Sequence, residues 1–346
     1  RKKLKSLLKE KAGDILQGPE NASLSRDKVG KVSIVAEKEG EIIDYKATVK
    51  QLNDDLNDNW KHEDFEEQVV IKTEKPEVTK ADLKDMTDEL GAYSTDAGGG
   101  ERWTNLKTGS SMLNGIILQP GEELSVYDST APYDEEHGYA EGTAYENGQV
   151  VPSYGGGICQ VATTLYNAVI RAELEITMRF NHSMLVHYVE PSMDAAIAEG
   201  AKDFRFVNNT EAPIYIEGYT YGGKIYFNLY GEEYRSADRK VTYESETLET
   251  IDPTTELTAD PEKAFGSMEQ IQSAHTGYKA KLWKIVTENG EQVSKEEVNN
   301  SYYQMTPNKY KVGVKTSNAE ASSAMYTAIA NNDLNQVYVV LNQYGG

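Results

Sequence analysis

The sequence predicts a multidomain α+β protein. Its 346 residues suit two or three domains better than one core. Helix and strand patterns alternate in the first 90 residues, an amphipathic run follows a glycine cluster near the middle, and residues 236–315 show only short strand patterns. Composition breaks at Gly98–Gly100 and around Glu232–Asp238 separate these parts. We therefore expect an α+β catalytic domain between a small α+β N-terminal domain and a β-rich C-terminal module.

Composition indicates a soluble globular chain whose main partners are neither nucleic acids nor anionic membranes. Charged residues make up 26% of the chain, the hydrophobic set makes up 38%, and the formal net charge is −21. Such an excess of carboxylates repels phosphate backbones and anionic lipids. No apolar run approaches the roughly 20 residues of a membrane span. We expect any membrane attachment to come only from an anchor outside this sequence.

Residues 1–90 are predicted to form the first domain. Val32–Val35 and Ile42–Ile43 have the pattern of strands, and runs with helical spacing lie around them. Thr79 is followed three positions later by Asp82, which is the spacing of a capping box at the start of a helix.

Residues 91–235 contain the stretch around which the chain is organised. Tyr154 is followed by three glycines, then by Ile158 and by Cys159, the only cysteine. Apolar residues then recur at helical spacing, so a helix should begin close to Cys159. A glycine run can turn its N–H groups inward, and a thiol at a helix N-terminus ionises more easily, so this order favours a thiolate nucleophile. The alternative is a small buried cysteine that packs a tight turn.

Histidine and aspartate follow the cysteine in the order that nucleophilic catalysis requires. His182 and His187 are five positions apart, so on a strand only one of them could face Cys159. Asp194 comes next and could orient an imidazole. No His-Glu-x-x-His or Cys-x-x-Cys motif competes with this interpretation, so we expect neither a metal nor another cofactor.

The remaining segments flank this centre. Residues 128–153 are rich in Tyr, Glu, Gly and Pro and lack strong periodicity, which favours an irregular substrate groove or a solvated loop. Residues 236–315 are predicted to be an all-β accessory module. Residues 316–346 are predicted to be a C-terminal tail, with a helix at Ala319–Ala330 and a last strand at Val337–Leu341.

The segment from Arg102 to Tyr230 resembles a VanW domain. The resemblance rests mainly on the run from Gly155 to Val161, Gly-Gly-Gly-Ile-Cys-Gln-Val, and on the downstream pair His182-Ser183. Residues 1–90 are similar to the peptidoglycan-binding domain that often precedes a VanW domain. Residues 236–315 resemble the β-rich wall-associated modules named for five glycines.

The resemblance implies work on the bacterial cell wall, at the extracellular face of the cytoplasmic membrane or in the wall itself, with peptidoglycan stem peptides as partners. Some VanW proteins are regarded as L,D-transpeptidases that use a cysteine, so Cys159 would be the nucleophile and His182 the base. Asp194 would complete the predicted catalytic set. The predicted substrate-binding residues are Tyr154, Gly156, Gly157, Gln160, Thr163, Arg179 and Ser183.

Two alternatives belong to other functional classes. The first is a cysteine peptidase, amidase or carboxypeptidase that cuts wall peptides with the same Cys–His pair. The second is a non-catalytic cell-wall-binding scaffold in which Cys159 only packs. Thiol reactivity distinguishes the scaffold from an enzyme, and product mass distinguishes a transferase from a hydrolase.

Overall fold

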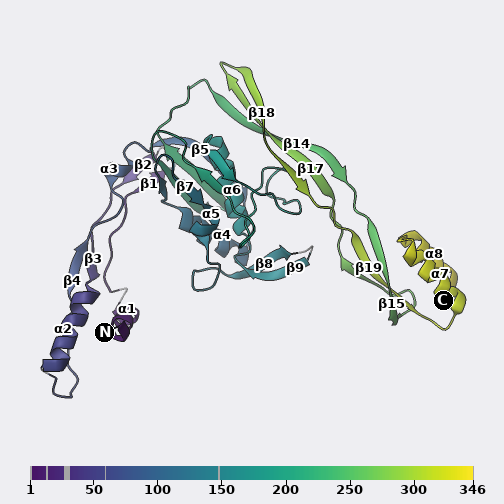
Figure 1. Ribbon diagram of the computed structural model, residues 1–346, viewed down its shortest axis with the longest axis horizontal. Helices are drawn as coiled ribbons and strands as arrows, with labels where there is room; N and C mark the ends of the chain where they lie inside the picture. Colours follow the sequence, from purple (N-terminus) through teal and green to yellow (C-terminus); the bar gives the residue numbers. More distant parts are fainter. Residues whose placement is uncertain (1, 13–14, 27–31, 59, 147–148, 346) are drawn as a thin grey trace. The chain divides into compact units, whose positions relative to one another are not determined.

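The chain divides into two units, Arg1–Asp88 and Glu89–Gly346, which are drawn in Figure 1. Both units contain helices and strands, which confirms the prediction of a multidomain α+β protein. The structure is a computed structural model that describes residues 2–12, 15–26, 32–58, 60–146 and 149–345.

The first unit combines helices with two antiparallel strand pairs, β1 with β2 and β3 with β4. The Asp82 carboxylate accepts a hydrogen bond from the Thr79 backbone N–H at 2.8 Å, as the capping-box spacing predicts. The elements of this unit are α1 (Lys2–Ala12), β1 (Ser23–Arg26), β2 (Val32–Val35), β3 (Gly40–Ile43), α2 (Tyr45–Asp58), β4 (Ile71–Glu74) and α3 (Lys80–Leu83).

The centre of the second unit is a four-stranded sheet with the order β5-β13-β12-β6, against which two helices pack. Helix α4 contacts β12, and α6 contacts β13. Gly222 and Gly223 join β12 to β13, and their positive φ angles suit a two-residue hairpin turn. These elements are β5 (Asp88–Asp96), α4 (Glu101–Leu113), β6 (Ile117–Leu118), α6 (Ile158–Arg171), β12 (Ile214–Tyr221) and β13 (Lys224–Gly231).

Two glycines allow β5 and α4 to approach α6 closely. A Cβ on Gly91 of β5 would lie 2.4 Å from the carbonyl oxygen of Ala168 and 2.5 Å from the backbone nitrogen of Ala172. A Cβ on Gly109 of α4 would lie 2.5 Å from Cδ1 of Ile158. Strand β5 thus packs closely on the C-terminal end of α6 and helix α4 on its first turn, which together fix the position of the helix.

A second sheet with the order β10-β11-β7 lies in the same unit. The segment 128–153, predicted to be irregular, instead contains the end of α5 and a hairpin formed by β8 and β9. Strand β8 contains Gly142 and a glutamate at each end, and Pro152 interrupts β9, so neither segment shows the apolar alternation that marks a half-buried strand. These elements are β7 (Glu123–Ser125), α5 (Val126–Thr130), β8 (Glu141–Glu146), β9 (Gln149–Tyr154), β10 (Glu175–Met178) and β11 (Arg205–Val207).

Two three-stranded sheets follow, with the orders β14-β17-β18 and β15-β19-β16. Strands β14, β17 and β18 pair in antiparallel fashion, whereas β15 and β19 are parallel. The all-β prediction for this module agrees with its assigned elements. These are β14 (Lys240–Ile251), β15 (Thr255–Ala264), β16 (Met268–Gln272), β17 (Gly277–Glu288), β18 (Glu291–Tyr303) and β19 (Asn308–Lys315).

The last residues of the chain form two helices, α7 (Ala319–Ala330) and α8 (Leu334–Tyr344), that share a small core with β15 and β19. The helix predicted at Ala319–Ala330 is confirmed, but the strand predicted at Val337–Leu341 is wrong. Val337 and Val340 are buried while Val339 is exposed, so the apolar positions follow helical spacing. The segment expected as a tail is therefore a packed helical pair.

The β14-β17-β18 sheet packs against the middle of the chain. Leu282 of β17 belongs to the same buried cluster as the residues of α6. Glu173, which lies two residues after the end of α6, is nearly buried and forms ion pairs with Arg239 at 2.8 Å and with Lys284 at 2.6 Å. Shared apolar packing and these ion pairs make the two parts one unit.

Candidate functional site

Cys159 lies in the first turn of α6, as predicted. Gly157 is the N-cap residue with a φ of 109°, a conformation that favours glycine, and Ile158 is the first helical residue. The N–H groups of a first helical turn have no partners within the helix, and the helix dipole is positive there. The Cys159 thiol is 3.3 Å from the carbonyl oxygen of Ile197. The start of the helix thus favours negative charge on the thiol.

His182 connects the thiol to Asp194. Its Nδ1 is 2.7 Å from Oδ2 of Asp194, and its backbone N–H donates to the same oxygen at 2.7 Å. Nε2 is then the ring nitrogen left for the Cys159 thiol, and each of the two groups shifts the pKa of the other. His187, the other candidate, is exposed. The structure therefore brings together Cys159, His182 and Asp194, the three predicted catalytic residues.

The Asp194 carboxylate is held by donors from several segments. Its side chain is 1% exposed. Oδ1 accepts from Nη2 of Arg179 at 2.9 Å and from the Tyr303 hydroxyl at 2.6 Å. Arg179 also donates through Nε to the Asp194 backbone carbonyl at 2.7 Å. With both oxygens occupied, the carboxylate has a fixed orientation toward His182.

The electrostatics of this cluster favour a thiolate–imidazolium pair. Burial would raise the pKa of the Cys159 thiol, but the hydrogen bond and charge of His182 lower it below its ordinary value. Burial would lower the pKa of His182, but the hydrogen bonds to Asp194 and Cys159 raise it to about 9. Burial would raise the pKa of Asp194, but His182 and Arg179 lower it to about 2. At neutral pH the proton therefore belongs on the imidazole.

Arg179, predicted to bind a substrate carboxylate, faces Asp194 in this structure. Its side chain is 7% exposed, and Nη1 donates to the Ser301 hydroxyl at 3.0 Å. These partners make it a positioning residue for Asp194. Contact between this guanidinium and a substrate stays a prediction.

Three of the predicted substrate-binding residues are buried and make contacts that build the site. Gln160 accepts from Nη2 of Arg102 at 2.6 Å, and its amide donates to the Asp96 carbonyl at 2.7 Å. The Gly156 carbonyl accepts from Asn105 at 3.0 Å. Thr163 donates to the carbonyl of Ala195 and accepts from its N–H, and this fixes the backbone beside Asp194.

The other predicted substrate-binding residues lie at the edge of the site or shape its backbone. Tyr154 and Ser183 have exposed side chains and are free to meet a ligand. Gly157 forms the cap described above, and a Cβ there would lie 3.1 Å from Cγ of Arg102. Substrate contact by any of these residues stays a prediction.

Sequence reasoning missed three side chains beside the site. Burial and then the nearby charge of Cys159 raise the pKa of the Tyr188 hydroxyl. Ser301 and Tyr303 reach Arg179 and Asp194 from β18. Tyr188 is one of the residues that match the VanW pattern, so a signal existed for it. Ser301 and Tyr303 are more than 100 positions from their partners, so local pattern gives no signal.

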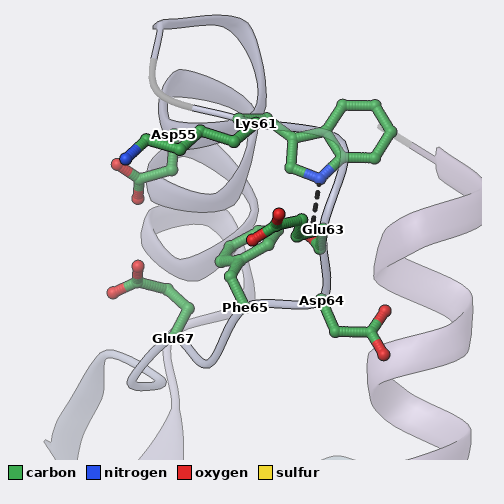
Figure 2. A pocket seen from close by; sticks show the side chains of 7 residues that line it. Asp55, Lys61, Glu63, Asp64, Phe65 and Glu67 are labelled. Carbon is green, nitrogen blue, oxygen red and sulfur yellow. Dashed lines mark hydrogen bonds between the residues drawn. The ribbon is translucent and has the colours of Figure 1, made fainter.

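A separate hollow of about 270 Å³ lies in the first unit, beyond the end of α2 (Figure 2). The Trp60 indole donates to the Glu63 carbonyl at 2.9 Å and forms part of its wall. The lining combines aromatic, acidic and lysine side chains and contains neither cysteine nor histidine: Asp55, Trp60, Lys61, Glu63, Asp64, Phe65 and Glu67. This hollow therefore lacks the two residue types that make up the centre at Cys159.

Three segments of the chain match family models. Residues 101–230 match the family described as VanW like protein, and residues 242–315 match the G5 domain. Residues 1–64 match the family described as "Putative peptidoglycan binding domain". The resemblances drawn from the sequence motifs are confirmed, and this set of domains indicates association with the bacterial cell wall.

Two curated proteins are similar to part of the chain. The uncharacterized protein YoaR of Bacillus subtilis is 34% identical over 149 residues, which are 42% of this chain and 49% of YoaR. The vancomycin B-type resistance protein VanW of Enterococcus faecalis is 31% identical over 113 residues, which are 31% of this chain and 41% of that protein. The chain thus spans about half or less of each relative.

Among solved structures, the IgA1 protease G5 domain is 29% identical over 22% of this chain and 94% of that chain, with a TM-score of 0.19. Within the described ranges, no helix has both the length and the apolar character needed to cross a membrane.

Proposed function

Because residues 101–230 form a VanW-like domain between a peptidoglycan-binding domain and a G5 domain, we propose that this protein cross-links peptidoglycan stems as a cysteine L,D-transpeptidase. It would act outside the cytoplasm, at the outer face of the membrane or in the wall. The observation that carries the proposal is the Cys159–His182–Asp194 arrangement at the start of α6. A thiol that only packs would have no need of a partly buried, carboxylate-bound imidazole beside it.

The first half-reaction is acyl transfer to the enzyme. The Cys159 thiolate attacks the carbonyl carbon of the amide between diaminopimelate and the terminal D-alanine of a tetrapeptide stem. The C–N bond breaks, the leaving amine takes the proton of the His182 imidazolium, and D-alanine departs. The backbone N–H of Cys159 would stabilise the oxyanion, because the N–H groups of Ile158 and Gln160 already donate to the carbonyls of Gly155 and Gly157. The product is a thioester on Sγ.

The second half-reaction forms the cross-link. Neutral His182 takes a proton from the side-chain amine of a second stem, and the amine attacks the thioester carbonyl. The C–S bond breaks, the new amide joins the two stems, and the thiolate–imidazolium pair is restored. Asp194 stabilises the imidazolium in both half-reactions and stays ionised throughout. Water would divert the thioester to hydrolysis, so an acceptor must be held close.

The same pair would serve the main alternative, a cysteine carboxypeptidase, peptidase or amidase with water as acceptor. That enzyme would release D-alanine or another fragment from wall peptides but would not form a dimer. A cell-wall-binding scaffold would form neither product. Stem-peptide substrates therefore separate these possibilities by product mass.

The test is incubation of the full chain with purified disaccharide-tetrapeptide, followed by mass spectrometry. The wild type should release D-alanine and yield a cross-linked dimer. Cys159→Ala should abolish both products, and His182→Ala should lower the rate by roughly a hundredfold or more. The matched control is His187→Ala, because His187 lies in the same segment but is exposed; its rate should stay close to wild type.

Each other outcome has a definite meaning. Tripeptide without dimer would assign the protein as a carboxypeptidase. A dimer formed by Cys159→Ala would show that the nucleophile is another residue. Equal losses in the His182 and His187 variants would remove His182 from the mechanism.

A further inference from the structure

We propose that β18 of the G5 domain is part of the reactive centre, and that Tyr303 and Ser301 are positioning residues for Asp194 and through it for His182 and Cys159. This inference rests on the proposed function in taking the thiol to be the reactive group. It assigns to the G5 domain a role inside the site, in addition to any contact it makes with the wall.

Tyr303 bridges two points of the segment that carries Asp194. Its side chain is fully buried. Its hydroxyl oxygen accepts from the Ser192 backbone N–H at 2.7 Å, and its proton is donated to Oδ1 of Asp194 at 2.6 Å. Burial and then the charge of Asp194 raise the pKa of Tyr303, so the phenol stays protonated as a donor. One hydroxyl thus fixes both the backbone before Asp194 and its carboxylate.

Ser301 holds the other partner of that carboxylate. Its hydroxyl accepts from Nη1 of Arg179 at 3.0 Å and from the Ser192 hydroxyl at 2.9 Å. Ser192 is buried and has a φ of 66°, which side-chain-bearing residues rarely adopt. Such a conformation persists only where surrounding contacts over-determine it. The contacts from β18 supply part of that constraint two residues before Asp194.

Along β18, every second side chain between Asn299 and Tyr303 points toward the segment that carries Asp194. Asn299 donates to the Tyr166 hydroxyl at 2.7 Å and to the Ser192 carbonyl at 3.1 Å. Asn299, Ser301 and Tyr303 are two residues apart, so their side chains share one face of the strand. The intervening Asn300 and Tyr302 are exposed. An interface that only packed would bury apolar side chains on that face, whereas this one carries three hydrogen-bonding side chains, of which Ser301 and Tyr303 are buried.

The consequence for the thiol follows from these contacts. Without the Tyr303 hydroxyl, the buried Ser192 N–H loses its acceptor and Asp194 loses a donor. The segment would then relax, and the carboxylate would move away from Nδ1 of His182. A less stabilised imidazolium makes the thiolate less favourable, so Cys159 should ionise at higher pH.

The test compares the full-length chain carrying Tyr303→Phe with one carrying Tyr243→Phe. Tyr243 is a tyrosine of β14 in the same domain interface, but its hydroxyl donates to the carbonyl of Ile170, about three helical turns from Cys159. The readout is the rate of iodoacetamide alkylation across pH, followed by intact mass, which is specific because the chain has one cysteine. Tyr303→Phe should raise the alkylation midpoint by about one pH unit, and Tyr243→Phe should leave it unchanged.

Ser301→Ala is the second variant, and it should raise the midpoint less than Tyr303→Phe does. It decides the question if Tyr303→Phe does not fold. Unchanged midpoints in every folded β18 variant, with only the melting temperature lowered, would make β18 a packing element and overturn the inference. Because alkylation needs no stem peptide, absence of cross-linking by the wild type would defeat the proposed reaction while leaving this test intact.

Discussion

Replacing Asp194 with asparagine should make the Cys159 thiol less acidic and the folded protein less stable. The amide has nearly the shape of the carboxylate but no charge, and one of its two ends can only donate. Arg179, which is 7% exposed, would lose its counter-ion. Breaking a buried ion pair from one side typically costs about 3–5 kcal/mol of folding stability. We expect a destabilised protein whose His182 no longer has an anionic partner.

The size of the effect on the thiol follows from His182. Its pKa of about 9 compares with an ordinary 6.5, so the folded protein favours the imidazolium by about 3 kcal/mol. Burial opposes this shift, and Asp194 is the largest cause in its favour. Without the carboxylate, the pKa of His182 should fall, because only the interaction with Cys159 would still oppose the effect of burial. The midpoint for Cys159 alkylation should then rise by about one to two pH units.

Asp203→Asn is the matched control for this prediction. Asp203 is also nearly buried, and it accepts from the Ser125 hydroxyl at 2.6 Å and from Nε of Arg205 at 2.7 Å. Its variant should lose stability but keep the wild-type alkylation profile. The assay measures alkylation rates from pH 5 to 10 in chains shown to be folded by circular dichroism. A folded Asp194→Asn protein with the wild-type midpoint would refute the coupling of Asp194, His182 and Cys159.

Two further predictions concern stability. Gly91→Ala should lower the free energy of unfolding by about 1–3 kcal/mol or more, because its Cβ would meet the backbone of α6. The measurement is urea unfolding. The control is Gly99→Ala, because a Cβ at Gly99 meets nothing within 4 Å. Glu173 should make the protein sensitive to acid. Burial opposes its ionisation, but Arg239 and Lys284 lower its pKa from 4.5 to about 2. The stability from this group is complete above pH 4.5 and is lost between pH 4.5 and 2, by about 3 kcal/mol. Glu173→Gln should therefore lose less stability than wild type over that range, and an equal loss would contradict the assignment.

The sequence predicted what depends on short-range pattern. The glycines before Cys159 and the apolar spacing after it place the start of α6, and the Thr79–Asp82 spacing places a cap. The segment Val337–Leu341 was misassigned, because a short apolar run fits a strand or a helix until its burial is known. The β8–β9 hairpin escaped notice because it lacks an alternating apolar face.

The candidate site was predictable only in part, because some of its contacts join residues that lie far apart in the sequence. Cys159, His182 and Asp194 lie within one domain, and the order of residues along the chain together with the family resemblance predicts all three. Tyr303 is 109 positions from Asp194, and its side chain reaches the carboxylate only because β18 docks against the segment that carries Asp194. No period or spacing in a single sequence encodes such a contact. Arg179 was predicted to bind substrate because the sequence alone does not show that its guanidinium pairs with Asp194.

Because β18 lies late in the chain, the Cys159 thiol can reach its full reactivity only after most of the chain has been made. A growing polypeptide contains Cys159, His182 and Asp194 long before Ser301 and Tyr303 are made. Contacts over such sequence distances form slowly, because the chain loses loop-closure entropy before the contacts stabilise it. The thiol of an incomplete chain should therefore keep close to ordinary acidity and acquire its nucleophilic state only when the last strand of that sheet docks. Maturation of the centre is in this way tied to completion of the fold.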